Sequence, residues 1–161
     1  LIDQDNVKRN CFNNITIFSG LQESTYQCLA GFFSGLFTLW KFKDRLEFHG
    51  LKVFGPKKYY KLTTNFKDLR VDFYLNEIEF AIERVVFQGF DHKTGKYEVN
   101  YDFGPLKEIN GLKIPSYWFS SQIGTRGNMY EISKVKINQF IDEDFFSNWE
   151  KECMARTNVK K

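Results

Sequence analysis

Hydrophobic residues recur at every second position along much of residues 46–123, and this is the period of a β-strand. Leu69, Val71 and Phe73 fall on one face of such a segment, while Arg70 and Asp72 fall on the other. This alternation is typical of a strand with one face buried and one face in water. The most regular segment places four apolar residues on a single face: Tyr97, Val99, Tyr101 and Phe103.

Short turn-forming segments separate these runs: Gly55-Pro56, Asn76-Glu77, Asp91 to Gly95 and Asn110-Gly111. Parallel neighbours need crossover connections of roughly a dozen residues or more, so short connections predict an antiparallel meander. A last alternating stretch runs from Met129 to Ile137, and residues 1–20 are expected to add at most one strand. Because no linker, repeat or low-complexity segment interrupts the chain, we expect residues 1–161 to form a single domain.

One amphipathic helix is predicted over residues 22–42, with Ser24 as a candidate N-cap. Its apolar residues follow the i, i+3, i+4, i+7 spacing and include Phe33, Phe37 and Trp40. Two internal glycines, Gly31 and Gly35, each cost about 1 kcal/mol relative to Ala in a helix. They favour either a buried helix that packs closely on the sheet or a soft lid. The apolar run of residues 28–40 is too short for the roughly 20 residues that cross a bilayer, so we do not expect a membrane-spanning helix.

The charge balance excludes a strongly basic nucleic-acid-binding surface. The chain has 23 Lys and Arg against 20 Asp and Glu, a formal net charge of +3, whereas phosphate recognition needs a concentrated basic patch. The 18 Phe residues indicate an aromatic core. The three cysteines, Cys11, Cys28 and Cys153, form no Cys-x-x-Cys pair, so a zinc ribbon or thioredoxin-type site is not expected.

The sequence offers little that would support catalysis. His49 and His92 are its two histidines, and each is interpreted as a surface or structural residue. The run Asp142-Glu143-Asp144 is interpreted as a solvated turn, because adjacent acids cannot all face one site. No nucleophile elbow, His-Glu-x-x-His helix or phosphate-binding glycine loop is present in the sequence. We therefore expect a protein that is not an enzyme and has no metal or other cofactor.

A series of local motifs appears in a specific order: Gly50 to Leu62, Tyr74-Leu75-Asn76, Asp91 to Gly95, Tyr101-Asp102-Phe103, Ile109 to Pro115, and Val135 to Phe146. In order and spacing this series resembles the C-terminal half of the bacterial outer-membrane lipoprotein-sorting family, the LolA-like periplasmic lipoprotein carriers. Members of that family carry a longer N-terminal portion, which residues 1–20 do not supply. The resemblance therefore implies a domain that lacks part of its N-terminal half.

The resemblance implies a mainly β fold, an antiparallel meander forming an incomplete (half) β-barrel with one or two helices over its concave face. It also implies a non-catalytic monomeric carrier of the periplasm or cell envelope that takes lipid or lipoprotein acyl chains from a membrane-bound donor to an acceptor. The chain begins Leu1-Ile2-Asp3 with no initiator Met, which indicates a mature, processed or truncated form, and the expected export signal is not visible in it. Burying one methylene contributes about 0.8 kcal/mol, so an apolar cavity alone supplies affinity.

The candidate cavity residues are those that share the apolar faces of the helix and strands: Phe33, Phe37, Trp40, Leu69, Val71, Phe73, Tyr97, Val99, Tyr101 and Phe103. Gly31 and Gly35 are the candidate hinges of the lid. Ordinary core packing is the alternative for each cavity residue, since alternation shows which residues share a face but not whether that face is filled. Two other functions stay open, namely an envelope-stress sensor or protein-interaction domain that uses the same half-barrel, and an enzyme built on a cone-shaped sheet.

Overall fold

The computed structural model describes residues 8–11, 14–17, 19–34, 39–92, 95–109 and 111–132. Within these ranges, side chains are described for residues 19–30, 39, 42–92, 95–109 and 111–132. The predicted turn at Asp142–Asp144, the strand residues beyond 132, Cys153 and the candidates Gly35 and Phe37 lie outside the described residues.

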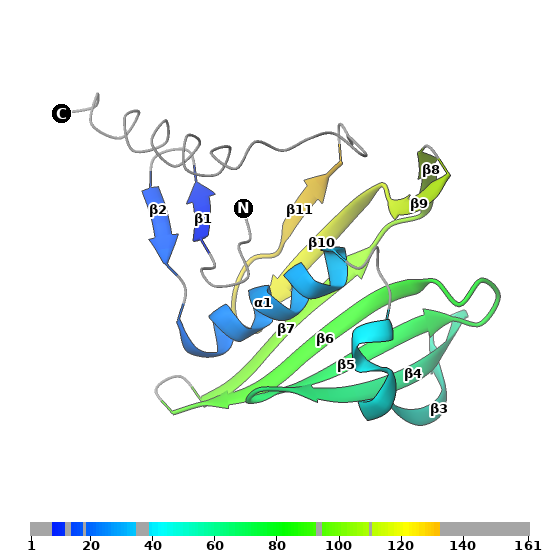
Figure 1. Ribbon diagram of the computed structural model, residues 1–161, viewed down its shortest axis with the longest axis horizontal. Helices are drawn as coiled ribbons and strands as arrows, with labels where there is room; N and C mark the ends of the chain where they lie inside the picture. Colours follow the sequence, from blue (N-terminus) through cyan, green and yellow to red (C-terminus); the bar gives the residue numbers. More distant parts are fainter. Residues whose placement is uncertain are drawn as a thin grey trace.

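Seven antiparallel strands form one open, curved sheet (Figure 1). The strand order is β11-β10-β7-β6-β5-β4-β3, so neighbours in the chain are neighbours in the sheet apart from one inserted hairpin. This arrangement confirms the predicted meander, and the sheet is not closed into a barrel. The strands are β3 (Glu47–Phe54), β4 (Lys57–Phe66), β5 (Leu69–Asn76), β6 (Ile82–Asp91), β7 (Gly95–Phe103), β10 (Tyr117–Gln122) and β11 (Asn128–Glu131).

Two separate hairpins complete the β structure. β8 (Leu106–Ile109) and β9 (Leu112–Pro115) pair with each other between β7 and β10, around the turn that Asn110-Gly111 predicted. β1 (Lys8–Cys11) and β2 (Asn14–Ile17) form the other hairpin, so the N-terminal segment supplies two strands where at most one was expected.

The predicted helix is divided into two elements. α1 spans Gly20–Ser34, and a short 3₁₀ helix, η1, spans Trp40–Arg45. The prediction that Ser24 caps the helix is wrong, because α1 begins four residues earlier and Ser24 lies buried inside it. None of the helices in the described residues is long and apolar enough to span a membrane.

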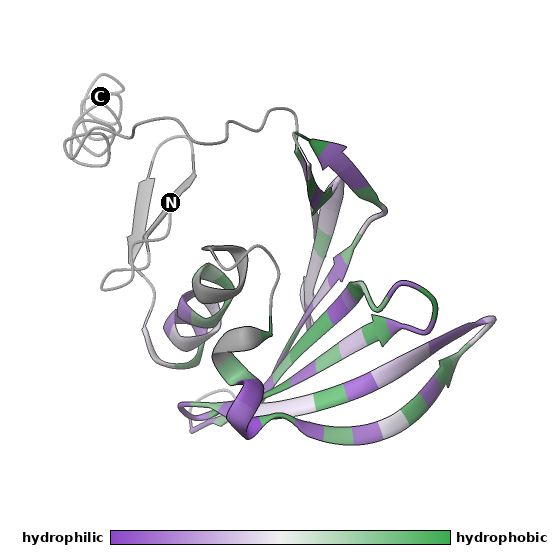
Figure 2. Ribbon diagram, turned by 45° about the vertical axis from the view of Figure 1, so that its right-hand side comes forward, coloured by the Kyte–Doolittle hydropathy of each residue, from purple (hydrophilic) through white to green (hydrophobic). Residues whose placement is uncertain are grey.

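Both helices lie on the concave side of the sheet (Figure 2). α1 turns one face toward the strands, and its buried residues Leu21, Ser24, Thr25, Cys28 and Leu29 are spaced three, one, three and one apart. This is the spacing of a single helical stripe. Gly89 in β6 makes the close approach possible, because a Cβ atom there would lie 3.1 Å from Leu21 Cδ1.

The convex face carries polar ladders between neighbouring strands. Asp72 is its most buried charge, only 2% exposed, and accepts hydrogen bonds from Thr63 at 2.7 Å and Arg70 at 3.1 Å. Lys61 Nζ lies 2.6 Å from the second carboxylate oxygen of Asp72. Arg84 pairs with Asp102 across β6 and β7 at 2.5 Å. Since a buried charge needs partners, this network explains how the outer face holds Asp72 without losing stability.

Candidate functional site

The seven strand residues predicted to share an apolar face do share one. All of them belong to a single buried cluster on the concave side, together with Leu21, Cys28, Leu29 and Phe42: Leu69, Val71, Phe73, Tyr97, Val99, Tyr101 and Phe103. Phe42 of η1 packs against Phe73 with ring centroids 5.8 Å apart. The centre of the concave face is therefore packed by the protein's own helices. Contact of these residues with an acyl chain stays a prediction.

The structure describes the candidate residues predicted on the helix only in part. Phe33 and Gly31 lie in the last turns of α1, and Trp40 begins η1, but the structure does not describe their side chains. Gly35 and Phe37 fall in the interval between the two helices, outside the described residues. The lid and its hinges thus stay predictions.

A hydrogen-bonded hydroxyl pair links α1 to the sheet. The Thr25 hydroxyl lies 2.9 Å from the Tyr97 hydroxyl of β7, and both residues are buried. Thr25 donates its hydrogen to the Leu21 carbonyl at 2.8 Å. Because a hydroxyl has one hydrogen, Tyr97 must be the donor to Thr25.

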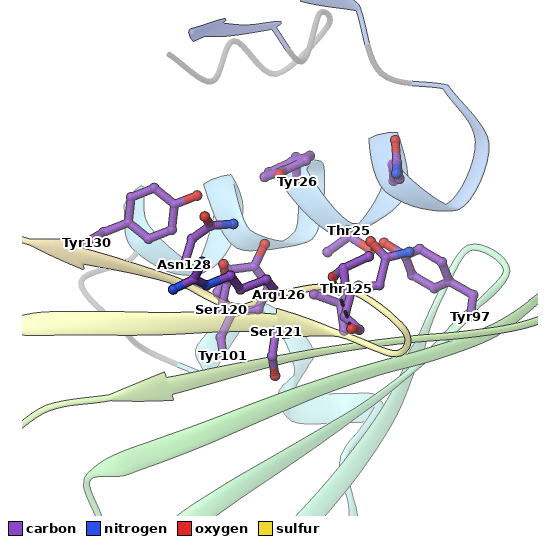
Figure 3. Close-up of a pocket in the computed structure, with 13 residues that line it drawn as sticks. Thr25, Tyr26, Tyr97, Tyr101, Ser120, Ser121, Thr125, Arg126, Asn128 and Tyr130 are labelled. Carbon is purple, nitrogen blue, oxygen red and sulfur yellow. Dashed lines mark hydrogen bonds between the residues drawn. The ribbon is translucent and has the colours of Figure 1, made fainter.

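A cavity of about 140 Å³ lies beside this pair, between α1 and strands β7, β10 and β11. Thirteen residues line it, and twelve of them have polar side chains, so we call it the polar cavity. Four of the lining residues are tyrosines: Tyr26, Tyr97, Tyr101 and Tyr130. Figure 3 shows these side chains gathered between the helix and the strands with Ser120, Arg126 and Asn128. Three predicted residues, Tyr97, Val99 and Tyr101, line this space, which is polar where the sequence predicted an apolar cavity.

Two tyrosines of the polar cavity, Tyr97 and Tyr101, stay protonated. Burial raises the pKa of Tyr101 far above its ordinary value, and the nearby hydroxyls of Tyr26 and Tyr97 raise it further. Burial also raises the pKa of Tyr97. These phenols therefore act as neutral hydrogen-bonding groups near pH 7 rather than as bases.

At the opposite end of the sheet, the concave face continues beyond the helices as exposed apolar surface. We call this the open shelf, formed by Phe48, Leu51 and Val53 of β3, Tyr60 of β4 and Phe80 of the β5–β6 turn. Their strand register places the β3 and β4 members on the same face as Leu62 and Phe73. Phe48 is 65%, Val53 63% and Phe80 61% exposed. In Figures 1 and 2 the hairpin end of β3 and β4 reaches away from α1.

An aromatic stack organises the open shelf. Phe80 stacks on Tyr60 with ring centroids 5.5 Å apart and an interplanar angle of 11°, and Phe48 lies 6.1 Å from the same ring. Phe80 adopts a left-handed backbone conformation with φ of +55°, which is unusual for a bulky residue. The Asn76 side chain fixes this turn by accepting hydrogen bonds from the amides of Ile78 and Glu79. The turn holds an aromatic ring on exposed surface at a conformational cost.

The other potentially reactive side chains that the structure describes are those of His49, His92 and Cys28. No group of three or more His, Cys, Asp and Glu there is arranged to hold a metal ion. His49 lies 3.5 Å from Glu47 on the exposed edge strand, and His92 packs its ring against Phe90. Cys28 is a free thiol in the core, where burial raises its pKa to about 12. Such a thiol is not a nucleophile near neutral pH.

Sequence reasoning missed both the polar cavity and the open shelf. Ser120 and Asn128 face the helix because they pair with Tyr101 and with each other, and this register is not visible in the sequence. For the shelf a signal existed, since Leu51 and Val53 alternate with Lys52 next to the Gly55-Pro56 turn. The alternation predicted which face of the strand these residues occupy. It did not predict that the helices leave them uncovered.

No family model, no curated protein and no solved structure matches this chain.

Proposed function

We propose that this domain is a non-catalytic carrier of the cell envelope that shields acyl chains of a lipid or lipoprotein on its concave face. The observation that supports the proposal is the open shelf, where a continuous apolar face leaves the packed core and enters solvent. Clustered exposed apolar side chains on one face mark interaction sites, in contrast to isolated ones. An acyl chain would lie along Phe48, Leu51 and Val53 and reach the covered residues only when α1 and η1 move.

The open shelf should bind an acyl chain with moderate affinity. A chain lying on an open surface hides about half of each methylene, so eight methylenes contribute about 3 kcal/mol from the chain. The apolar surface that the shelf itself loses to solvent adds to this at about 25 cal/mol per Å². Because no polar contact must break, release to an acceptor is not hindered. A transient carrier needs this combination.

A pair of matched variants tests the proposal. Phe48 on the shelf and Phe90 on the convex face have nearly the same exposure, 65% and 67%, and each contacts one other ring. Delipidated protein titrated with a fluorescent fatty-acyl probe should bind it saturably. Phe48→Asp should weaken binding about tenfold or more by placing a charge against the chain, whereas Phe90→Asp should leave binding unchanged.

Two results would contradict the carrier. One is delipidated protein that takes up no probe, and the other is equal loss of binding in Phe48→Asp and Phe90→Asp. Native mass spectrometry after gentle purification adds an independent measurement, because a carrier should retain lipid mass that delipidation removes.

A protein-binding role is the second candidate, and the edge of the sheet favours it. β3 is the outermost strand of the described sheet on this side, and seven of its eight residues are exposed. Strands with free edges accept a strand from a partner by backbone hydrogen bonding. Under this alternative, the β3 amides gain protection from hydrogen exchange when envelope extract is added, and the acyl probe does not bind.

A further inference from the structure

The polar cavity is built by a row of side chains across three neighbouring strands. Tyr101 of β7 pairs with Ser120 of β10, and Ser120 pairs with Asn128 of β11. Residues directly opposite one another in an antiparallel sheet have Cβ atoms about 5 Å apart. Three polar groups thus face α1 side by side, at the level where Tyr26 lines the helix side of the cavity (Figure 3).

The charge of this lining has one sign. Arg126 is the one charged residue among the thirteen that line the cavity in the described part of the chain, and no Asp or Glu is among them. The remaining polar groups are hydroxyls and amides, which donate as well as accept. A lining with a guanidinium and several donors favours an anion over a cation.

The β10–β11 turn fixes the position of Arg126. The Thr125 amide and hydroxyl both donate to the Gln122 carbonyl, at 3.0 and 3.1 Å. On the other side of Arg126, the Phe119 ring packs directly on Gly127, where any Cβ atom would overlap the ring at 2.1 Å. The backbone on both sides of Arg126 is therefore held in place, and the guanidinium projects from an ordered turn.

Tyr130, two residues beyond Asn128 on β11, is also held. The ring of Tyr130 stacks on Trp118 with centroids 5.4 Å apart and an interplanar angle of 19°. Stacking fixes the plane of the phenol, so its hydroxyl is presented at the cavity without free rotation of the whole side chain. A preorganised donor set loses little entropy when it binds a ligand.

We propose that the polar cavity binds a small oxyanion, a carboxylate or a phosphate group, with Arg126 supplying the charge and the Tyr101, Ser120, Asn128 and Tyr130 side chains supplying hydrogen bonds. The volume fits, since 140 Å³ accommodates about four or five water molecules at roughly 30 Å³ each, and either oxyanion is of that size. The site does not depend on the acyl carrier. It lies over β7, β10 and β11, whereas the open shelf lies over β3 and β4 at the other end of the strand order.

Amide chemical shifts measured during titration of the whole chain test the proposal. Sodium phosphate, sodium acetate and glycerol are the probes, and sodium chloride keeps the ionic strength constant. We expect saturable shifts in residues 25–26 and 120–130 with at least one of the two anions, and weaker or no shifts with glycerol. The anion that binds more tightly identifies the group, because phosphate and acetate differ in charge and geometry.

Four variants distinguish anion binding at this site from a nonspecific effect of the protein's net charge. Arg126→Gln should weaken anion binding about tenfold or more, because a charge-assisted bond is lost, and Arg126→Lys should retain part of it. Arg45→Gln, an exposed arginine at the end of η1, changes the net charge equally and should have no effect. Tyr130→Phe keeps the ring stack and should weaken binding about threefold through loss of a single hydrogen bond.

Three results would overturn the oxyanion site: no saturable shifts with either anion, equal shifts with glycerol, or unchanged binding in Arg126→Gln. A folded spectrum in Arg126→Gln and Arg126→Lys is the control, and an exposed turn residue should leave the fold intact. Phe48→Asp, which tests the acyl carrier, should leave anion binding unchanged. Failure of one proposal can thus be distinguished from failure of the other.

Discussion

The hydroxyl pair of Thr25 and Tyr97 makes a sharp prediction about how α1 is held on the sheet. Thr25 donates to Leu21 within the helix, so Tyr97 donates to Thr25. Thr25→Val removes the hydroxyl that accepts this bond, so the Tyr97 hydroxyl loses its acceptor. Tyr97→Phe removes the donor, and Thr25 keeps its bond to the Leu21 carbonyl. The two substitutions break the same bond, but only Thr25→Val leaves a donor unpaired.

The expected costs differ accordingly. Thr25→Val leaves a donor of a buried residue unpaired and should lower the free energy of unfolding by about 1–3 kcal/mol. Tyr97→Phe loses one hydrogen bond and should cost only about 0.5–1.5 kcal/mol. The double variant replaces both partners by apolar groups of similar shape. It should be no less stable than Thr25→Val alone, because the unpaired donor is gone.

Urea unfolding of the four proteins, followed by circular dichroism, measures these differences. Each kcal/mol should also lower the melting temperature by about 2–4 °C in a chain of this size. Additive costs in the double variant would refute the assigned direction of the hydrogen bond, and so would Tyr97→Phe being the more costly change. Nearly equal single costs would show that water in the polar cavity pairs the Tyr97 hydroxyl in Thr25→Val, and would contradict the predicted penalty of an unpaired donor.

Three further predictions concern packing, charge and strain. Gly89→Ala should cost about 1 kcal/mol in urea unfolding, since its methyl would crowd Leu21 Cδ1 at 3.1 Å and the Asp68 carbonyl oxygen at 3.3 Å, and Leu21→Ala in the same chain should remove only the part of that cost due to Leu21. Burial alone would raise the pKa of Asp72, but hydrogen bonds from Lys61, Thr63 and Arg70 lower it below its ordinary value. Stability from Asp72 is therefore present above roughly pH 4 and lost as the pH falls through the lowered pKa. Asp72→Asn should lower stability near pH 7 by about 2 kcal/mol and flatten this acid dependence in unfolding curves, whereas an unchanged acid slope would contradict it. Phe80→Gly should relieve the φ strain that Phe80→Ala retains, so calorimetry should find Phe80→Ala the less stable by about 1 kcal/mol, and equal stability would contradict the strain.

The strands and their faces could be predicted because a period of two survives in the sequence. Leu69, Val71 and Phe73 are buried as expected, and Asp91 pairs with Gly95 at the predicted hairpin. The helix start could not be predicted from capping preference. Ser24 is a good N-cap in isolation, but the helix starts at Gly20, and Leu21 in its first turn packs close to Gly89 of the sheet, a tertiary contact that capping preference does not include.

The candidate sites depended on information that no local pattern holds. Tyr97, Val99 and Tyr101 were predicted to face inward, and they do. Whether the space above them is filled depends on where α1 lies and on which residues of β10 are opposite them. The cavity is polar because Ser120 and Gln122 pair with Tyr101 and Val99, and a register shifted by one residue would place Phe119 there instead.

The width of the sheet explains why its concave face has two different ends. Seven strands spaced about 4.8 Å apart span roughly 29 Å, whereas a helix with its side chains is only about 10–12 Å wide. α1 and η1 together cover the centre, where the buried cluster lies, and leave both margins uncovered within the described residues. At the β10–β11 margin the uncovered residues are hydroxyls, amides and Arg126, which water solvates at no cost. At the β3–β4 margin they are Phe48, Leu51, Val53 and Phe80, whose exposure to water is unfavourable. The apolar margin therefore gains free energy when an apolar partner covers these side chains, and this is the physical basis of the proposed binding of an acyl chain.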